Sequence, residues 1–244
     1  MHNILTITSR ELKSYFSSPL SYIFIVIFLG LAGGMTFFFG NFIERRQSDL
    51  YSFFQFHPYL YLFLIPAIGM RLWAEERKTG TVEFLMTLPV STSQAVIGKF
   101  LAAWVYAGIA LALTFPLWIT VNYLGEPDNG IIVAAYFGSW LMAGGFLALS
   151  ASASALTNNQ VIAFVLGATV CFLFLMSGVE FVQSFFRAWA PDVIVDAVAG
   201  LSFLTHFSDI SQGVIDFRNI VFFASVIGIA LFVNTAIVEI KKGR

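Results

Sequence analysis

Charged residues are scarce in this sequence. Asp, Glu, Lys and Arg make up 11% of its 244 residues, whereas a soluble domain carries about 25%. So few charges exclude a soluble protein of this size, and the 58% of hydrophobic residues also excludes disorder, collagen and coiled coil. The hydrophobic residues form long continuous runs instead of the alternating segments of a membrane β-barrel. The composition therefore predicts an all-α, polytopic membrane protein.

Disulfides, a strong net charge and a cluster of metal ligands are also missing. The single cysteine, Cys171, allows no internal disulfide, and the net charge of −1 predicts no binding of nucleic acid. His2, His57 and His206 are too far apart in the sequence to predict a metal site. The N-terminus lacks a small-residue cleavage site, so we expect the first span to target the chain itself.

Six apolar segments are each long enough to cross a bilayer, within a single domain over residues 1–244 that has no internal repeat. The predicted spans are 20–42, 51–73, 100–124, 131–156, 161–179 and 219–238. The end of the fourth span, 148–155, consists almost entirely of small residues, which predicts close helix packing. For Gly33-Gly34 and Gly144-Gly145, packing is favoured over a hinge.

Residues 1–19 are expected to form a helix in the membrane interface. Leu5, Leu12, Tyr15 and Phe16 fall near one helical face, and Pro19 marks the bend into the first span. A solvated lead-in is the alternative.

Basic residues predict the orientation of the spans. With both termini on one side, that side carries nine of the 13 Lys and Arg residues, which places it in the cytoplasm. The nine are Arg10, Lys13, Arg71, Arg77, Lys78, Lys99, Lys241, Lys242 and Arg244, against Arg45, Arg46, Arg187 and Arg218 on the outer side. Within the spans the one charged residue is Arg71, which argues against an ion-coupled carrier.

The cytoplasmic segment 74–99 carries the first functional signal. It leaves the second span with a charged group and a turn, namely Glu75, Glu76, Arg77 and Lys78 followed by Thr79, Gly80 and Thr81. With Thr81 as its candidate N-cap, a short helix is predicted over 82–88, and Pro89 ends it. Ser91 and Gln94 then form a capping box that begins the helix into the third span.

The short helix is apolar although it lies outside the bilayer. Phe84, Leu85 and Met86 must therefore be covered. Physical chemistry leaves two alternatives about equal: these side chains pack on the protein's own spans or the lipid surface, or they dock into a partner protein.

The run E-E-R-K-T-G-T-V-E-F-L-M-T-L-P-V-S over 75–91, followed by Gly98-Lys99-Phe100, resembles the ABC-2 class of ABC-transporter permeases. The segment 201–216 further resembles the gliding-motility-type and copper-enzyme-maturation-type members. The resemblance covers nearly the whole chain, including an interfacial N-terminal helix and an amphipathic segment before the last span.

This resemblance implies a permease in the bacterial cytoplasmic (inner) membrane that pairs with a second copy or a paralogue and receives separate ABC ATPase subunits. The helix 81–88 would dock into the ATPase through Phe84, Leu85 and Met86, while charges at Glu75, Glu76, Arg77 and Glu83 set its register. An exporter is the expected function. The alternative is a subunit that transmits force or acts as a scaffold for an outer-side envelope protein without transporting a solute.

The chain also lacks a P-loop. Its Gly98-Lys99 pair is followed by Phe100 and lacks the Gly-x-x-x-x-Gly-Lys-Ser/Thr frame whose backbone amides cradle phosphate. We therefore expect the chain itself to be no enzyme and to bind no cofactor, with ATP and Mg held by the partner ATPase.

The outer segment 180–218 is the second informative region. Its pieces are too short to span, so they are expected to lie in the outer interface, with Pro191 breaking one helix and Asp192 capping the next. The resemblance implies that such helices cap the translocation path as an outer gate, with candidates Phe181, Phe185, Phe186, Trp189, His206, Phe207 and Asp209. The alternatives are aromatic anchoring at the lipid headgroups and a hydrogen-bonded structural role for His206.

Overall fold

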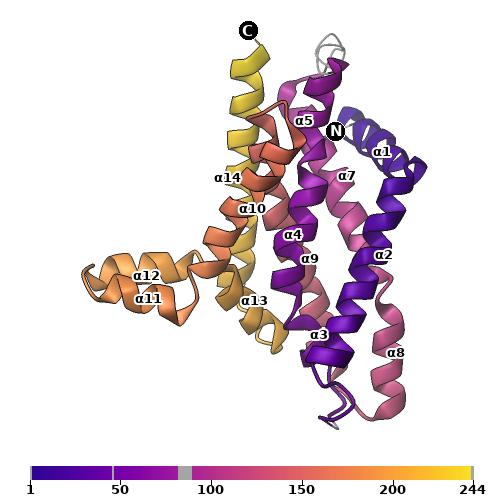
Figure 1. Ribbon diagram of the computed structural model, residues 1–244, viewed down its shortest axis with the longest axis vertical. Coiled ribbons are helices and arrows are strands. Elements are labelled where there is room, and N and C mark those ends of the chain that lie inside the picture. The colour runs from indigo at the N-terminus through magenta and orange to yellow at the C-terminus, as the bar shows by residue number, and fades with distance from the viewer. Residues whose placement is uncertain (1, 46, 82–89, 243–244) are drawn as a thin grey trace.

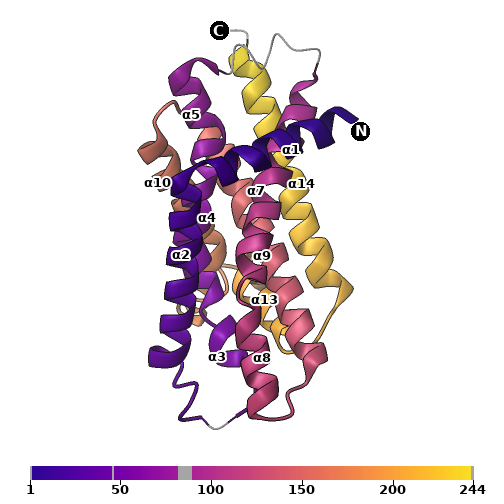
Figure 2. The same cartoon turned by 90° about the vertical axis from the view of Figure 1, so that its right-hand side faces the viewer.

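The computed structural model describes residues 2–45, 47–81 and 90–242, and helices account for all regular structure in them (Figure 1). The elements are α1 (His2–Ser17), α2 (Pro19–Gly34), the π-helical turn η1 (Met35–Phe39), α3 (Tyr51–Phe54), α4 (His57–Gly69), α5 (Arg71–Thr79), α7 (Thr92–Ala112), α8 (Phe115–Leu124), α9 (Asn129–Ala155), α10 (Gln160–Met176), α11 (Glu180–Arg187), α12 (Asp192–Gly200), α13 (Phe203–Ser211) and α14 (Phe217–Lys242). Both termini lie near the same end of the bundle, which we call the terminal end (Figures 1 and 2).

Four helical stretches of the described chain are long and apolar enough to cross a membrane. They are Pro19–Phe39, Thr92–Leu124, Asn129–Ala155 and Phe217–Lys241. The number rises to six if each of two bent pairs counts as one span, with α11 turned 73° from α10 and α13 turned 59° from α12. The chain is therefore a multi-pass helical membrane protein, as the composition predicts.

The predicted second span, 51–73, is not one continuous helix. It is divided into α3, α4 and α5, with breaks before His57 and at Met70. Pro58 lies in the first turn of α4, where its missing N–H costs nothing, whereas Pro66 lies inside the helix and removes one hydrogen bond. The break before α4 precedes Pro58, and the break before α5 coincides with a tertiary contact at Met70.

Helix α9 is the centre of the bundle. Of its apolar stretch 72% is buried, against 22% for the stretch of α2 and 17% for that of α14. Helices α4, α7, α10, α13 and α14 all pack against it. Small residues make this possible: a Cβ atom on Gly69 of α4 would lie 2.5 Å from the Cβ of Ser150, and one on Gly167 of α10 would lie 3.3 Å from the Ser150 Cα. The predicted close packing at 148–155 is confirmed.

The break between α4 and α5 is held by a single hydroxyl from α9. The Ser154 Oγ donates to the carbonyl oxygen of Met70 at 2.7 Å and accepts from the backbone N–H groups of Trp73 and Ala74 at 3.2 and 3.0 Å. Ser154 is fully buried. Because buried backbone groups need partners, this side chain makes the break tolerable inside the bundle.

Replacing Ser154 by Ala will therefore leave three backbone groups with no side-chain partner. We expect the variant to lose about 3 kcal/mol of stability, since each of the three buried groups costs at least roughly 1 kcal/mol when it is unsatisfied. The measurement is the free energy of unfolding in detergent. The control is Ser225→Ala on α14, where an exposed hydroxyl bonds its own helix at Val221 and a loss below about 0.5 kcal/mol is expected. Equal losses in both variants would contradict the assignment.

Helix α1 lies across the bundle at the terminal end rather than along it (Figure 2). It packs on α7, where a Cβ on Gly98 would lie 2.7 Å from the Ile7 side chain, and Tyr15 stacks on Tyr106 at 4.9 Å. The structure forms the expected N-terminal helix and packs it on the bundle, and its position in the membrane interface stays a prediction. Ile7 and the carboxylate of Glu11 face the bundle, whereas Leu5 is 66% exposed and faces away from it.

Two tryptophans lock α7 to α9. The indoles of Trp104 and Trp140 stack with centroids 4.2 Å apart, and each N–H donates to the other residue's carbonyl oxygen, at 2.9 and 3.3 Å. Each ring lies over a glycine of the facing helix: a Cβ on Gly108 would lie 2.9 Å from the Trp140 Nε1, and one on Gly144 would lie 2.7 Å from the Trp104 Nε1. At Gly144 the packing interpretation is therefore correct. Gly33, by contrast, has open space around its Cα.

Candidate functional site

The predicted coupling residues begin on α5 at the terminal end. Glu75, Glu76 and Arg77 lie in the second half of this helix. Gly80 ends it with a φ of +74°, a left-handed conformation that glycine adopts without strain. Thr81 already has helical geometry, so its prediction as the N-cap is wrong. The predicted docking residues Glu83, Phe84, Leu85, Met86 and Pro89 lie outside the described residues.

On the far side of 82–89, α7 begins as predicted. The Ser91 Oγ accepts from the backbone N–H of Gln94 at 3.3 Å, and the Gln94 side chain accepts from the Ser91 N–H at 3.3 Å. This capping box fixes the start of α7 at Thr92. Residues 92–99 therefore form two turns of helix ahead of the predicted third span, and α5 and α7 flank the segment 82–89.

Lys99 joins the three helices that meet here. Its side chain is 3% exposed, and its ammonium nitrogen lies 2.5 Å from Glu76 of α5 and 3.3 Å from Glu11 of α1. The indole of Trp73 lies 5.6 Å from the same nitrogen. We call Lys99, Glu11 and Glu76 the charged joint. Through this one buried cation, the charged joint connects α1, α5 and α7.

The electrostatics of the charged joint favour its ionised form. Burial raises the pKa of Glu11, but the charges of Lys99 and Arg10 outweigh burial, and the net pKa lies below the ordinary 4.5. A lowered folded-state pKa means that this pair contributes stability above pH 4.5 and loses it as the pH falls further. Beside the joint, Arg71 pairs with Glu75 at 2.7 Å. A polar cavity of about 200 Å³ opens between α1, α2, α5 and α7 at this point.

Lys99 is the residue that sequence reasoning did not assign to the site. From the sequence, Lys99 is only part of the run Gly98-Lys99-Phe100 and one of nine basic residues on the predicted cytoplasmic side. The capping box at Ser91 is the sequence signal that points to Lys99. A helix that begins there places Lys99 two turns after the helix start, within the packed bundle. Its two carboxylate partners are 88 and 23 positions away along the chain, so no local pattern marks them.

The outer-gate candidates lie in two separate places. Phe181, Phe185, Phe186 and Trp189 belong to α11 and its end, which with α12 forms a hairpin that projects sideways from the bundle (Figure 1). No described residue of α11 is buried, and Phe181 is 80% exposed. Asp192 is the first residue of α12 and Pro191 its N-cap, so the predicted cap is displaced by one residue. Exposed rings on a hairpin outside the bundle are compatible with both predicted roles, aromatic anchoring and an outer gate.

His206, Phe207 and Asp209 lie instead on α13, which packs against α9 and α14. The ring of His206 stacks on Phe222 at 4.0 Å, and its Nδ1 and Nε2 lie 2.6 and 3.1 Å from the oxygens of Asn219 and Gly200. Phe207 is buried. This histidine is engaged at both nitrogens, which favours the structural alternative. Across the described residues no group of three or more His, Cys, Asp or Glu side chains could hold a metal ion.

A second buried polar group was not anticipated from the sequence. His57 is fully buried on α4, with its Nδ1 2.8 Å from the Ser139 Oγ, which also lies 2.8 Å from the hydroxyl of Tyr61. The rings of Phe53 and Phe54 enclose the imidazole. This cluster ties α4 to α9 near the end opposite the termini. It adds a polar link to the small-residue contact at Gly69.

Apolar spanning helices, a charged joint at one end and an exposed amphipathic hairpin near the other define a multi-pass membrane protein built around α9. The family profile described as ABC-2 family transporter protein matches residues 21–191, which is more than two thirds of the chain. The chain belongs to this family and is a membrane permease subunit of an ABC transporter. No curated protein matches the sequence. The narrower resemblance to gliding-motility-type and copper-enzyme-maturation-type permeases stays a prediction.

Proposed function

We propose that this chain is the membrane subunit of an ATP-driven exporter, and that a separate ATPase subunit drives it through the segment 82–89. The proposal includes the predicted orientation, with the terminal end in the cytoplasm of a bacterium and the protein in its inner membrane. The missing P-loop supports a separate ATPase, because this chain offers no frame of backbone amides for a nucleotide phosphate. ATP and Mg would be held by that subunit.

The charged joint is the observation that carries the proposal. The segment 82–89 connects α5 to α7, and Lys99 holds the adjoining parts of both helices and of α1 together. A displacement of 82–89 by a partner would therefore move these helix ends as a unit. Two contacts lead on to the central helix: Ser154 holds the break before α5, and the tryptophan pair locks α7 to α9. A displacement of 82–89 would therefore be transmitted through α5 and α7 to α9.

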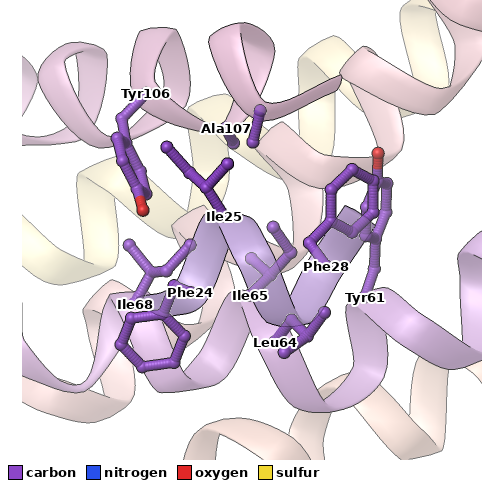
Figure 3. A pocket seen from close by; sticks show the side chains of 10 residues that line it. Phe24, Ile25, Phe28, Tyr61, Leu64, Ile65, Ile68, Tyr106 and Ala107 are labelled. Atoms are coloured by element: carbon purple, nitrogen blue, oxygen red, sulfur yellow. The ribbon is translucent and has the colours of Figure 1, made fainter. Parts of the chain in front are cut away.

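We place the pathway between two copies, or between a copy and a paralogue, and not through the apolar pocket beside α2 in a single chain. The pocket between α2, α4 and α7 has a volume of about 30 Å³, room for about one water molecule. Figure 3 shows that its lining includes Ile25, Phe28, Tyr61, Ile65 and Tyr106. Such a space is too small and too apolar to pass a polar solute. An exposed apolar face on α2 is available for a second chain.

The docking segment can be tested by replacing Phe84 and Leu85 with Asp together. We expect the ATPase to dissociate from the permease and ATP-dependent transport to be lost, because two charges cannot enter an apolar groove. The measurement is co-purification of the ATPase and ATP hydrolysis in proteoliposomes. Leu5→Asp is the matched control: Leu5 is a 66% exposed leucine at the same end of the bundle but outside the segment. Retention of the ATPase and of full activity by the double variant would contradict the assigned docking segment.

The same preparation addresses the alternative function. The isolated chain should hydrolyse no ATP, and turnover by the chain alone would overturn the separate-ATPase proposal. A complex that contains the ATPase and a large outer-side envelope protein, but moves no solute, would favour force transmission or a scaffold role instead.

A further inference from the structure

An apolar groove runs along the outside of the bundle between α10 and α14. Both helices pack on α9, which forms the floor between them. The groove has a volume of about 360 Å³. Its rim consists of exposed side chains and its floor of buried small ones: Leu156, Leu166, Ile229 and Val233 on the rim, and Ala153 and Ala230 on the floor.

The groove contains almost no free polar surface. Its one polar side chain, Ser152, is bonded to the carbonyl oxygens of Ala148 and Ala230, at 3.0 and 2.7 Å. Along α14 the lining runs from Val226 to Ile237, which at 1.5 Å per residue is about 16 Å. Half of the roughly 30 Å hydrocarbon core of a bilayer is about 15 Å. The groove therefore has the length and polarity of one acyl chain within a single leaflet.

A basic side chain, Lys241, lies at the end of the groove nearer the termini. The ammonium group of Lys241 donates to the carbonyl oxygen of Leu156 at 2.5 Å, and Leu156 is itself part of the rim. A headgroup at this level would meet this ammonium group, and a basic residue near the membrane surface attracts anionic lipids.

We propose that this groove binds one phospholipid with an anionic headgroup, its acyl chain between α10 and α14 and its phosphate beside Lys241. The leaflet is the cytoplasmic one, a detail that rests on the orientation in the proposed function. A second copy is a poorer occupant, because two copies in one membrane share the same orientation. The copy's own Lys241 would then lie at the same level in the membrane, and like charges would oppose the contact.

The proposal is tested by exchanging lipids on the purified full chain. The protein is reconstituted in vesicles of equal parts phosphatidylglycerol and phosphatidylcholine, re-extracted in detergent, and weighed by native mass spectrometry. We expect one retained phospholipid per chain, with phosphatidylglycerol favoured about fivefold, since a basic residue near the headgroup contributes about that factor. Lys241→Gln should keep the lipid but reduce this preference to about one.

Filling the groove should remove the lipid. Ala230→Phe places a ring on the floor, whereas the control Ala224→Phe adds the same ring at an exposed position of the same helix. Only the first should lose the retained phospholipid. Retention by Ala230→Phe, or an unchanged headgroup preference in Lys241→Gln, would overturn the proposal.

A photo-crosslinking residue keeps the test decisive if Ala230→Phe does not fold. With benzophenone side chains at Ile229 on the rim or at Phe232 off the groove, the lipid adduct should form in detergent at Ile229 alone. A crosslink to a second copy, or no adduct, would overturn the site. None of these measurements involves the ATPase, so failure here and failure of the coupling proposal are distinguishable.

Discussion

Replacing Lys99 by Met is expected to destabilise the protein by about 3 kcal/mol, the lower end of the range for breaking a buried ion pair. The variant leaves the carboxylates of Glu11 and Glu76 without their shared cation, and these side chains are only 18% and 22% exposed. Their residual exposure keeps the loss at the lower end, because water screens part of the uncompensated charge. The measurement is the free energy of unfolding in detergent, with hydrogen exchange reporting whether α1 detaches from α7.

Removing all three charges of the joint should be milder than removing the cation alone. In the triple variant Glu11→Gln, Glu76→Gln and Lys99→Met no charge of the joint remains, and Arg10, which loses Glu11 as a partner, is 55% exposed to water. Replacing a buried charged set by neutral groups is often close to neutral. We expect the triple variant to recover most of the stability that Lys99→Met loses. If the two variants unfold with the same free energy, Lys99 acts through packing and not as the shared cation.

Gly144→Val should disrupt the tryptophan lock at the centre of the bundle. A Cβ at this position would lie 2.7 and 2.8 Å from Nε1 and Cε2 of Trp104 and 3.1 Å from the Ile227 side chain. The indole cannot give way cheaply, because it is stacked on Trp140 and donates to its carbonyl oxygen. We expect a loss of about 3 kcal/mol, the upper end for overpacking a core, measured by unfolding and by the near-ultraviolet circular dichroism of the stacked indoles.

Gly228→Val is the matched control for this substitution. Gly228 lies in the last spanning helix, and a Cβ there meets nothing within 4 Å. The same change in residue type should therefore alter stability by less than about 0.5 kcal/mol. Equal destabilisation by both variants would show that helix propensity, not contact with Trp104, determines the outcome.

Local patterns in the sequence were reliable where one segment decides its own structure. The capping box at Ser91 and Gln94 fixes where α7 begins, and Pro19 starts α2 after the bend. Each depends on neighbouring residues and on the fixed geometry of the first helical turn. Local patterns failed where a distant residue intervened. Lys99 is an example, because its partners Glu11 and Glu76 lie 88 and 23 positions away along the chain.

The break in the second span also depends on both a local pattern and a contact with a distant residue. Pro58 and Pro66 are visible in the sequence, yet the helix is interrupted at Met70, where Ser154 reaches across from α9. A partner 84 positions away along the chain has no local signature. Its effect exists because Gly69 and Ser150 let the two helices approach closely.

By itself, the sequence determined that this chain is a helical membrane protein and that its few charges lie almost entirely outside the apolar segments. It could do so because hydropathy and capping act over one helix at a time. Only the tertiary structure decided which of those charges meet. Lys99 was one basic residue among 13 until folding placed it between Glu11 and Glu76. The reason is physical: a buried charge must find its partners wherever the packing of the helices brings them, however far apart they lie along the chain.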